Sequence, residues 1–179
     1  MNPGRPGPPA RSLKARALQW LAQREHSRSE LRRKLLRHAQ TSGSVGDGAA
    51  GEEDAAAPAD VDALLDWLEA HRYLSQERFA ESRVHARAAR YGNLRIRQEL
   101  ALHQVALSPA AEQGLKDSEL ARARAVWARR FDAAATTPNE RARQARFLTG
   151  RGFSAEVVRR VLREAGTALA DEDSDTAAH

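Results

Sequence analysis

Residues 95–105 read RIRQELALHQV, and two related segments lie elsewhere in the chain, ELRRKLLRHA at 30–39 and RQARFLTGRGF at 143–153. The aligned positions are Leu31/Leu35/Ala39, Ile96/Leu100/Gln104 and Gln144/Leu148/Gly152. The last two sets are 48 residues apart, and the first two are 65 apart, of which a small-residue acidic stretch occupies about 17. A period of about 48 residues has room for three helices, so it predicts stacked helical units that bury a shared core.

Helical patterns also occur outside these segments. Residues 61–68 carry Val and Leu at the i, i+3, i+4, i+7 spacing of one helix face. The tetrapeptides SRSE at 27–30 and TPNE at 137–140 fit the capping box that begins many helices. No segment alternates convincingly with a period of two, and the apolar 41% of the chain is mostly Leu, Val and Ala. We therefore expect an all-α protein built from tandem three-helix repeats.

The period also predicts the domain boundaries. The three expected repeats are residues 12–72, 73–117 and 118–165. The segments expected to be disordered are an N-terminal tail at 1–11, an acidic insert at 40–57 within the first repeat, and an acidic tail at 166–179. These segments hold too few large apolar residues to offset the entropy of ordering them.

The charge of the chain is unevenly distributed. The formal net charge is +5, but residues 11–165 without the insert carry 28 Lys and Arg against 16 Asp and Glu, a net of +12. A body of this charge attracts polyanions such as nucleic acid, or an acidic protein surface. The alternative is an ordinary solvated charged surface, and charge alone does not separate the two.

The sequence lacks the common catalytic and metal-binding motifs. The chain has no Cys, which excludes disulfides and thiolate chemistry. Its six His lack the i, i+4 spacing that a helical zinc site shows. The glycines of TGRGF at 149–153 lack the G-K-[ST] ending of a phosphate loop. We therefore expect a protein that is not an enzyme and has no catalytic residue, metal or cofactor.

The sequence also predicts where the protein works. No apolar run approaches the roughly 20 residues that span a bilayer. The N-terminal stretch MNPGRPGPPARS is rich in Pro and Gly and lacks the apolar core of a signal peptide. We expect a cytoplasmic protein with no membrane partner.

Basic residues gather at corresponding places in the three repeats. In the helix expected near residues 75–91, Arg83, Arg87 and Arg90 follow i, i+4, i+7 beside an apolar stripe. Such clusters would form an extended positive surface for nucleic-acid phosphates or an acidic groove. The alternative is that the arginine stems cover the edge of the core while their charged ends stay in water. The candidate partner- or DNA-binding residues are Arg28, Arg32, Arg33, Arg83, Arg87, Arg90, Arg95, Arg97, Arg141, Arg143 and Arg146.

Four segments of the chain carry a family resemblance. They are ALQWLAQREHSRSELRRKL at 17–35, LLDWLEAHRYLSQERFAESRV at 64–84, YGNLRIRQEL at 91–100 and ARFLTGRGFSAEVVRRVL at 145–162. In their order and spacing, the chain resembles the bacterial RecX family, regulators of the recombinase RecA. It departs from the family in the insert at 40–57, which replaces a turn that is short in most members. It also has Gln104 where many members have Gly, so the turn after the fifth helix is expected to differ.

The resemblance implies more than the residues alone do. It implies an elongated, curved stack of three-helix repeats and a negative modulator of RecA. Such a protein would bind the RecA–DNA filament and restrain recombinase, ATPase and coprotease activity in DNA repair and the SOS response. It also implies no cofactor, and weak and sequence-indifferent binding to single- or double-stranded DNA. Repeats that share a core within one chain give no reason to expect a dimer, so we expect a monomer. On this hypothesis, reversal of Arg83, Arg87 and Arg90 to Glu weakens filament binding and leaves helicity unchanged.

Other functions stay open at this point. A RecA-independent DNA-binding protein with tandem helix-turn-helix-like units would show sequence-dependent DNA affinity. A helical scaffold for an unrelated protein would depend little on DNA or salt. An enzyme with an unrecognised site is the third alternative.

Overall fold

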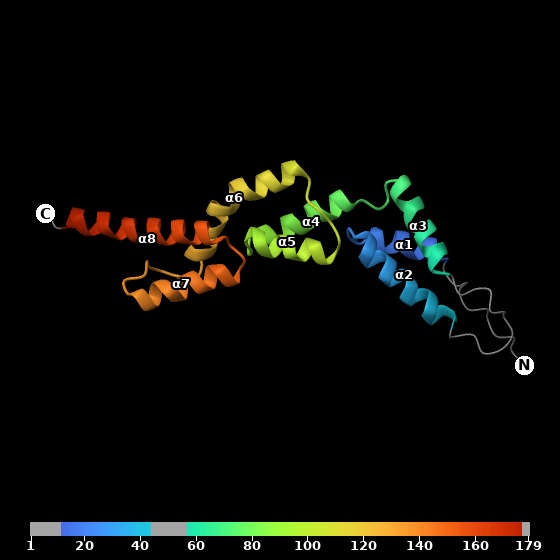
Figure 1. Cartoon of the computed structure of the whole chain (residues 1–179), viewed down its shortest axis with the longest axis horizontal. Helices are drawn as coiled ribbons and strands as arrows, with labels where there is room; N and C mark the ends of the chain where they lie inside the picture. The colour runs from blue at the N-terminus through green and yellow to red at the C-terminus, as the bar shows by residue number, and fades with distance from the viewer. Residues whose placement is uncertain (1–11, 44–56, 177–179) are drawn as a thin grey trace, which may run out of the picture. The chain divides into compact units, whose positions relative to one another are not determined.

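The computed structural model describes residues 12–43 and 57–176, and the regular structure of these residues is entirely helical (Figure 1). The helices are α1 (Leu13–Leu21), α2 (Arg28–Gly43), α3 (Pro58–Ala70), α4 (Gln76–Ala88), α5 (Asn93–Leu102), α6 (Pro109–Ala128), α7 (Pro138–Gly150) and α8 (Ala155–Thr176). The prediction of an all-α protein is confirmed. The curvature of the stack stays a prediction.

The chain divides into two compact units, residues 1–79 and 80–179, and the division falls within α4. In the first unit, α2 packs against both α1 and α3. The core of this unit consists of buried Ala17, Leu31, Leu35, Val61, Leu65, Leu68 and Leu74. The apolar face predicted at residues 61–68 thus supplies much of the core.

The second unit is built around α6, which packs against α5, α7 and α8. Its core consists of Ala123, Val126, Leu148, Phe153, Val158, Val161 and Leu162. Ile96 and Leu100 of α5 are also buried, as the repeated pattern predicts. The predicted repeat boundary at 117/118 falls inside α6, because no proline interrupts its helical sequence there.

Two of the segments expected to be disordered are largely helical where the structure describes them. Helix α2 continues to Gly43, and α8 continues to Thr176. The residues just after Ala165 include Ala and Leu, which are strong helix formers and extend α8. The remaining parts of these predictions, at 1–11, 44–56 and 177–179, lie outside the described residues.

The predicted helix starts are largely confirmed. Thr137 and Glu140 form a full capping box at α7. At α2, the Ser27 hydroxyl accepts a hydrogen bond from the Glu30 backbone N–H at 3.1 Å, as predicted. The Glu30 carboxylate binds the Arg24 guanidinium. This ion pair joins the turn before α2 to the first turn of the helix.

Three helices end in the same left-handed turn. Arg72, Gln104 and Gly152 have φ of 60°, 58° and 83° and follow α3, α5 and α7. After α5, the Val105 N–H donates to the carbonyl of Leu100 at 3.1 Å, and 48 residues later the Phe153 N–H donates to that of Leu148 at 3.3 Å. This hydrogen bond closes a Schellman turn, which glycine most readily adopts. The expectation that Gln104 produces a different turn is therefore wrong.

Candidate anion-binding site

The turn after α4 pairs with the turn after α7. The Gly92 N–H donates to the Arg151 carbonyl at 2.9 Å, and the Leu94 N–H donates to the Gly152 carbonyl at 3.0 Å. A Cβ on Gly92 would lie 2.2 Å from the Gly152 carbonyl oxygen, and a Cβ on Gly152 would lie 2.6 Å from the Cβ of Arg95. Neither position therefore accommodates a side chain without displacing the other turn.

A buried carboxylate supports the pairing from behind. Glu119 of α6 is 6% exposed. It accepts hydrogen bonds from the Asn93 N–H at 3.1 Å and from the N–H and hydroxyl of Ser154, both at 3.2 Å. Asn93 is the first residue of α5, and Ser154 immediately precedes α8. One side chain of α6 thus fixes the first turns of two other helices.

Arg122, three residues further along α6, binds the same region from the side. It donates to the carbonyls of Tyr91 at 2.8 Å, Leu115 at 3.1 Å and Ala88 at 3.3 Å, and to the Asn93 side-chain oxygen. Burial lowers the pKa of Arg122, and the charge of Glu119 partly opposes this effect. Its guanidinium joins the α4–α5 turn to α6, where Leu115 lies.

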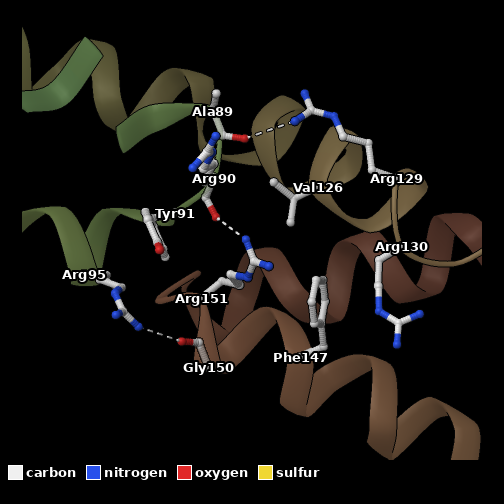
Figure 2. A pocket seen from close by; sticks show the side chains of 10 residues that line it. All are labelled: Ala89, Arg90, Tyr91, Arg95, Val126, Arg129, Arg130, Phe147, Gly150 and Arg151. Carbon is white, nitrogen blue, oxygen red and sulfur yellow. Dashed lines mark hydrogen bonds between the residues drawn. The ribbon is translucent and has the colours of Figure 1, made fainter. Parts of the chain in front are cut away.

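A hollow of about 570 Å³ opens beside the paired turns (Figure 2). It is lined by Ala89, Arg90, Tyr91, Arg95, Val126, Arg129, Arg130, Phe147, Gly150 and Arg151. We call this hollow the five-arginine pocket. Among the described residues that line it, none is Asp or Glu. Guanidinium groups stay ionised at any pH a protein tolerates, so the pocket carries concentrated positive charge.

Three of the five arginines are held by backbone carbonyls. Arg95 donates to the carbonyl of Gly150 at 3.4 Å, Arg129 to that of Ala89 at 3.4 Å, and Arg151 to that of Arg90 at 3.3 Å (Figure 2). A guanidinium has five N–H donors, so each of these contacts leaves most of the fork available.

Two of these three guanidiniums also lie over the face of an aromatic ring. Arg95 lies 4.7 Å from the Tyr91 ring centre, and Arg151 lies 5.0 Å from that of Phe147. A guanidinium stacked on a ring keeps the N–H groups at its edge directed away from that ring. The pocket therefore presents ordered donors to an anion.

Five of the eleven predicted arginines bind carboxylates within their own unit. The pairs are Arg28 with Asp66 and Glu69, Arg32 with Asp62, Arg83 and Arg87 with Glu99, and Arg97 with Glu112. Arg32 binds both oxygens of Asp62, at 2.7 and 2.9 Å, and its hydrogen bond lowers the pKa of that carboxyl. These arginines join neighbouring helices, and their binding to a partner stays a prediction.

The other six candidates occupy different places. Arg90 and Arg95 line the five-arginine pocket. Arg33, Arg141 and Arg146 are exposed on α2 and α7. Arg143 lines a second hollow of about 420 Å³, which also contains Asp132 and Glu140. The structure therefore brings only two of the predicted candidates together at a purely basic hollow.

Sequence reasoning missed three residues of the pocket, Arg129, Arg130 and Arg151. Arg151 lies in the TGRGF segment, where the repeat pattern and the phosphate-loop comparison both concern the glycines and not the arginine. Arg129 and Arg130 directly follow α6. The 48-residue period also aligns the helix ends and the turns that follow them. Basic residues in those turns can lie close together in space, so this alignment could have indicated the pocket.

Residues 12–43 and 57–176 contain no group of three or more His, Asp or Glu that could hold a metal ion. In the same part of the chain, no helix is both long and apolar enough to cross a bilayer.

Comparison with known proteins gives a consistent result. Family models described as the second and third three-helix domains of RecX match residues 75–108 and 117–162. The chain is 50% identical to the regulatory protein RecX of Ralstonia nicotianae over 90% of this chain and 93% of that protein. It is 47% identical to that of Herminiimonas arsenicoxydans over 85% of this chain and 91% of the relative.

A solved structure supports the fold. The crystal structure of RecX from Lactobacillus salivarius matches with a TM-score of 0.60 over 87% of this chain and 95% of that one, at 15% identity. The extensive identity to the curated relatives confirms the resemblance found in the sequence. This chain belongs to the RecX family of regulatory proteins, which are not enzymes.

Proposed function

We propose that this protein is a negative modulator of RecA. It binds the RecA–DNA filament and restrains the recombinase, ATPase and coprotease activities in DNA repair and the SOS response. The observation that carries this proposal is its 50% identity to a RecX regulatory protein over nearly the whole of both chains.

The charge of the protein supports docking to a nucleoprotein filament. Its body has an excess of Arg, and the five-arginine pocket concentrates part of that excess in one hollow. Basic surfaces raise the rate of encounter with a polyanion over distances of about 10 Å in 0.1 M salt. Binding to DNA alone is then weak and indifferent to sequence, because phosphate contacts carry no sequence information.

The test is the DNA-dependent ATP hydrolysis of RecA on single-stranded DNA. The protein is titrated well below one copy per RecA, and a basic protein of similar net charge serves as the control. Marked inhibition by this protein alone is the expected result, since a filament-binding regulator affects many RecA subunits at once. Equal inhibition by the control would reduce the effect to competition for DNA.

The same titration distinguishes RecA regulation from the main alternative. A RecA-independent DNA-binding protein with helix-turn-helix-like units would bind DNA without inhibiting RecA. It would also discriminate between duplexes of different sequence, which phosphate contacts do not.

The proposal includes a location and an oligomeric state. The protein acts in the cytoplasm, where RecA meets DNA. It acts as a monomer, since the cores of its two units are each filled by residues of the same chain. Light scattering of the purified protein at micromolar concentration checks the mass.

A further inference from the structure

We propose that the five-arginine pocket binds the phosphodiester backbone of DNA. This inference deepens the proposed function, on which it rests for the source of the DNA. It assigns the contact to Arg90, Arg95, Arg129, Arg130 and Arg151. Three of these, Arg129, Arg130 and Arg151, are not among the candidates predicted from the sequence.

The charge of the pocket favours a polyanionic ligand. The pocket holds five guanidiniums in a hollow of about 570 Å³ whose described lining contains no carboxylate. Arg83 and Arg87 on nearby α4 differ, because Glu99 already binds both. Like charges held together repel, and a bound polyanion relieves that repulsion. The pocket is therefore suited to a ligand with several negative charges.

Several arginines of the pocket are already held in place before a ligand binds. Arg95, Arg129 and Arg151 are each fixed by a carbonyl of a neighbouring turn, and aromatic rings hold Arg95 and Arg151 from one face. Fixed guanidiniums lose less side-chain entropy when they bind. The planar fork also matches the paired oxygens of a phosphate better than a single ammonium does.

The aromatic rings argue for backbone contact and against base reading. Proteins that hold single-stranded bases stack them on exposed aromatic faces. Here Arg87, Arg95 and Arg151 all lie within 6 Å of the Tyr91 ring centre, at 5.9, 4.7 and 5.8 Å. Guanidiniums thus surround the ring on which a base would have to stack. The contact is with phosphates, and the binding is indifferent to sequence.

An acidic peptide fits the pocket less well. Extended peptides are commonly bound through free backbone groups of the receptor together with apolar side-chain pockets. The carbonyls of Ala89, Arg90 and Gly150 at the rim already accept hydrogen bonds from arginines. Val126, the one aliphatic residue larger than Ala in the lining, is only 5% exposed. The pocket therefore offers few anchors for an extended peptide compared with its five guanidiniums.

The test uses the full chain without RecA. Two double variants each remove two charges from the pocket, Arg129→Gln with Arg130→Gln and Arg90→Gln with Arg95→Gln. The control is Arg159→Gln with Arg163→Gln, which removes two charges from exposed positions of α8 outside the pocket. Binding of a labelled dT oligonucleotide is followed by fluorescence anisotropy over a range of salt concentrations. Circular dichroism checks that each variant keeps the helical content of the parent.

Each pocket variant should weaken binding by about tenfold or more at low salt and reduce the slope of log K against log salt by about 1.4, for two lost contacts to single-stranded DNA. The control should keep the slope of the parent. A methylphosphonate oligonucleotide, which lacks backbone charge, should bind the parent and the pocket variants equally weakly. The use of two pocket variants from different elements keeps the test decisive if one of them fails to fold.

Two results overturn the inference. In one, both folded pocket variants bind DNA as the control does. In the other, the pocket variants keep their DNA affinity and lose binding to poly-glutamate, which assigns the pocket to an acidic protein segment. Neither result bears on RecA regulation, which the ATP hydrolysis experiment with the parent protein tests separately.

Discussion

Gly92 and Gly152 approach so closely that a Cβ on Gly92 would lie 2.2 Å from the carbonyl oxygen of Gly152. The first residue belongs to the α4–α5 turn and the second to the α7–α8 turn. Their contact explains the glycine in the YGN segment and the second glycine in TGRGF. It also places Arg95 and Arg151 at the edge of one hollow.

Gly92→Ala should lower the free energy of unfolding by about 2 kcal/mol or more, because the added methyl group meets backbone atoms that cannot rotate away. The control is Gly114→Ala. Gly114 lies inside α6 with no atom within 4 Å of the added Cβ, so this change should raise the unfolding free energy by about 0.5–1 kcal/mol. Urea unfolding followed by circular dichroism measures both. Equal effects of the two changes would contradict the turn pairing.

Gln104→Gly should stabilise the protein by up to about 1 kcal/mol. Gln104 holds a φ of 58°, which costs a residue with a Cβ about 1–2 kcal/mol and which glycine adopts freely. Thermal melting of the variant checks the gain.

Gly152→Ala is the reverse change in the equivalent turn after α7. It should lower the free energy of unfolding by more than the positive φ alone would cost. Its Cβ would meet the Cβ and backbone N of Arg95 at 2.6 and 2.7 Å, besides adopting a positive φ. If the loss of unfolding free energy is no larger than the gain from Gln104→Gly, the turns at Gln104 and Gly152 are packed alike.

Arg122→Lys should destabilise the protein by about 2–3 kcal/mol although it keeps the charge. The guanidinium reaches carbonyls and a side-chain oxygen on several sides, and a single ammonium cannot bind all of them. The matched control is Arg124→Lys on the same helix. Arg124 is half-exposed and pairs with Glu164, so its replacement should cost less than about 1 kcal/mol. Denaturant midpoints for the two variants give the comparison.

The first unit should become less stable as the pH falls below about 6.5. Burial and the charge of Arg24 lower the pKa of His26 in the folded state, although Glu30 opposes them. The unfolded chain, in which this His has its ordinary pKa of 6.5, therefore binds more protons in the window below that value, so acidification favours unfolding. The loss should continue until the pH passes the lowered pKa of the folded state.

Melting temperatures between pH 8 and 5.5 test this dependence. His26→Gln should flatten the decline in that range, whatever its effect at pH 8. His71→Gln, at an exposed position, should leave the decline as it is in the parent. A decline that is unchanged in both variants would rule out His26 as its source.

The structure changes the design of one mutational test. On the sequence alone, reversal of Arg83, Arg87 and Arg90 to Glu leaves helicity unchanged. Arg83 and Arg87 bind Glu99, so reversal would put three carboxylates together between α4 and α5. A loss of function in that variant would not separate binding from folding. Substitution of Arg90 and Arg95 by Gln avoids this difficulty.

Much of the fold could be predicted because core positions repeat locally. Leu35, Leu100 and Leu148 occupy the same position of the repeated pattern, and all three are buried. Caps such as Thr137 were also visible, since a cap and its partner are three residues apart. Patterns of this kind depend on short separations along the chain.

The candidate site was harder to predict because its contacts are distant in sequence. Arg95 lies 55 residues from Gly150, and Glu119 lies 35 from Ser154. A helical pattern gives no sign that Glu119 is buried, since a charged residue usually marks an exposed face. The arginine pattern in the sequence therefore mixed residues that join helices with residues that line the pocket.

The pairing of the two turns also affects how the chain folds during synthesis. Arg90 and Arg151, which meet across the pair, are separated by 61 residues. At roughly 5–20 residues per second, the ribosome takes about 3–12 s to make the intervening chain. During that interval Gly92 and Leu94 have no partner for their N–H groups in the α7–α8 turn. The second unit can therefore complete its fold only after α8 has begun to emerge, and a chain that stalls earlier exposes an unfinished surface to chaperones and proteases.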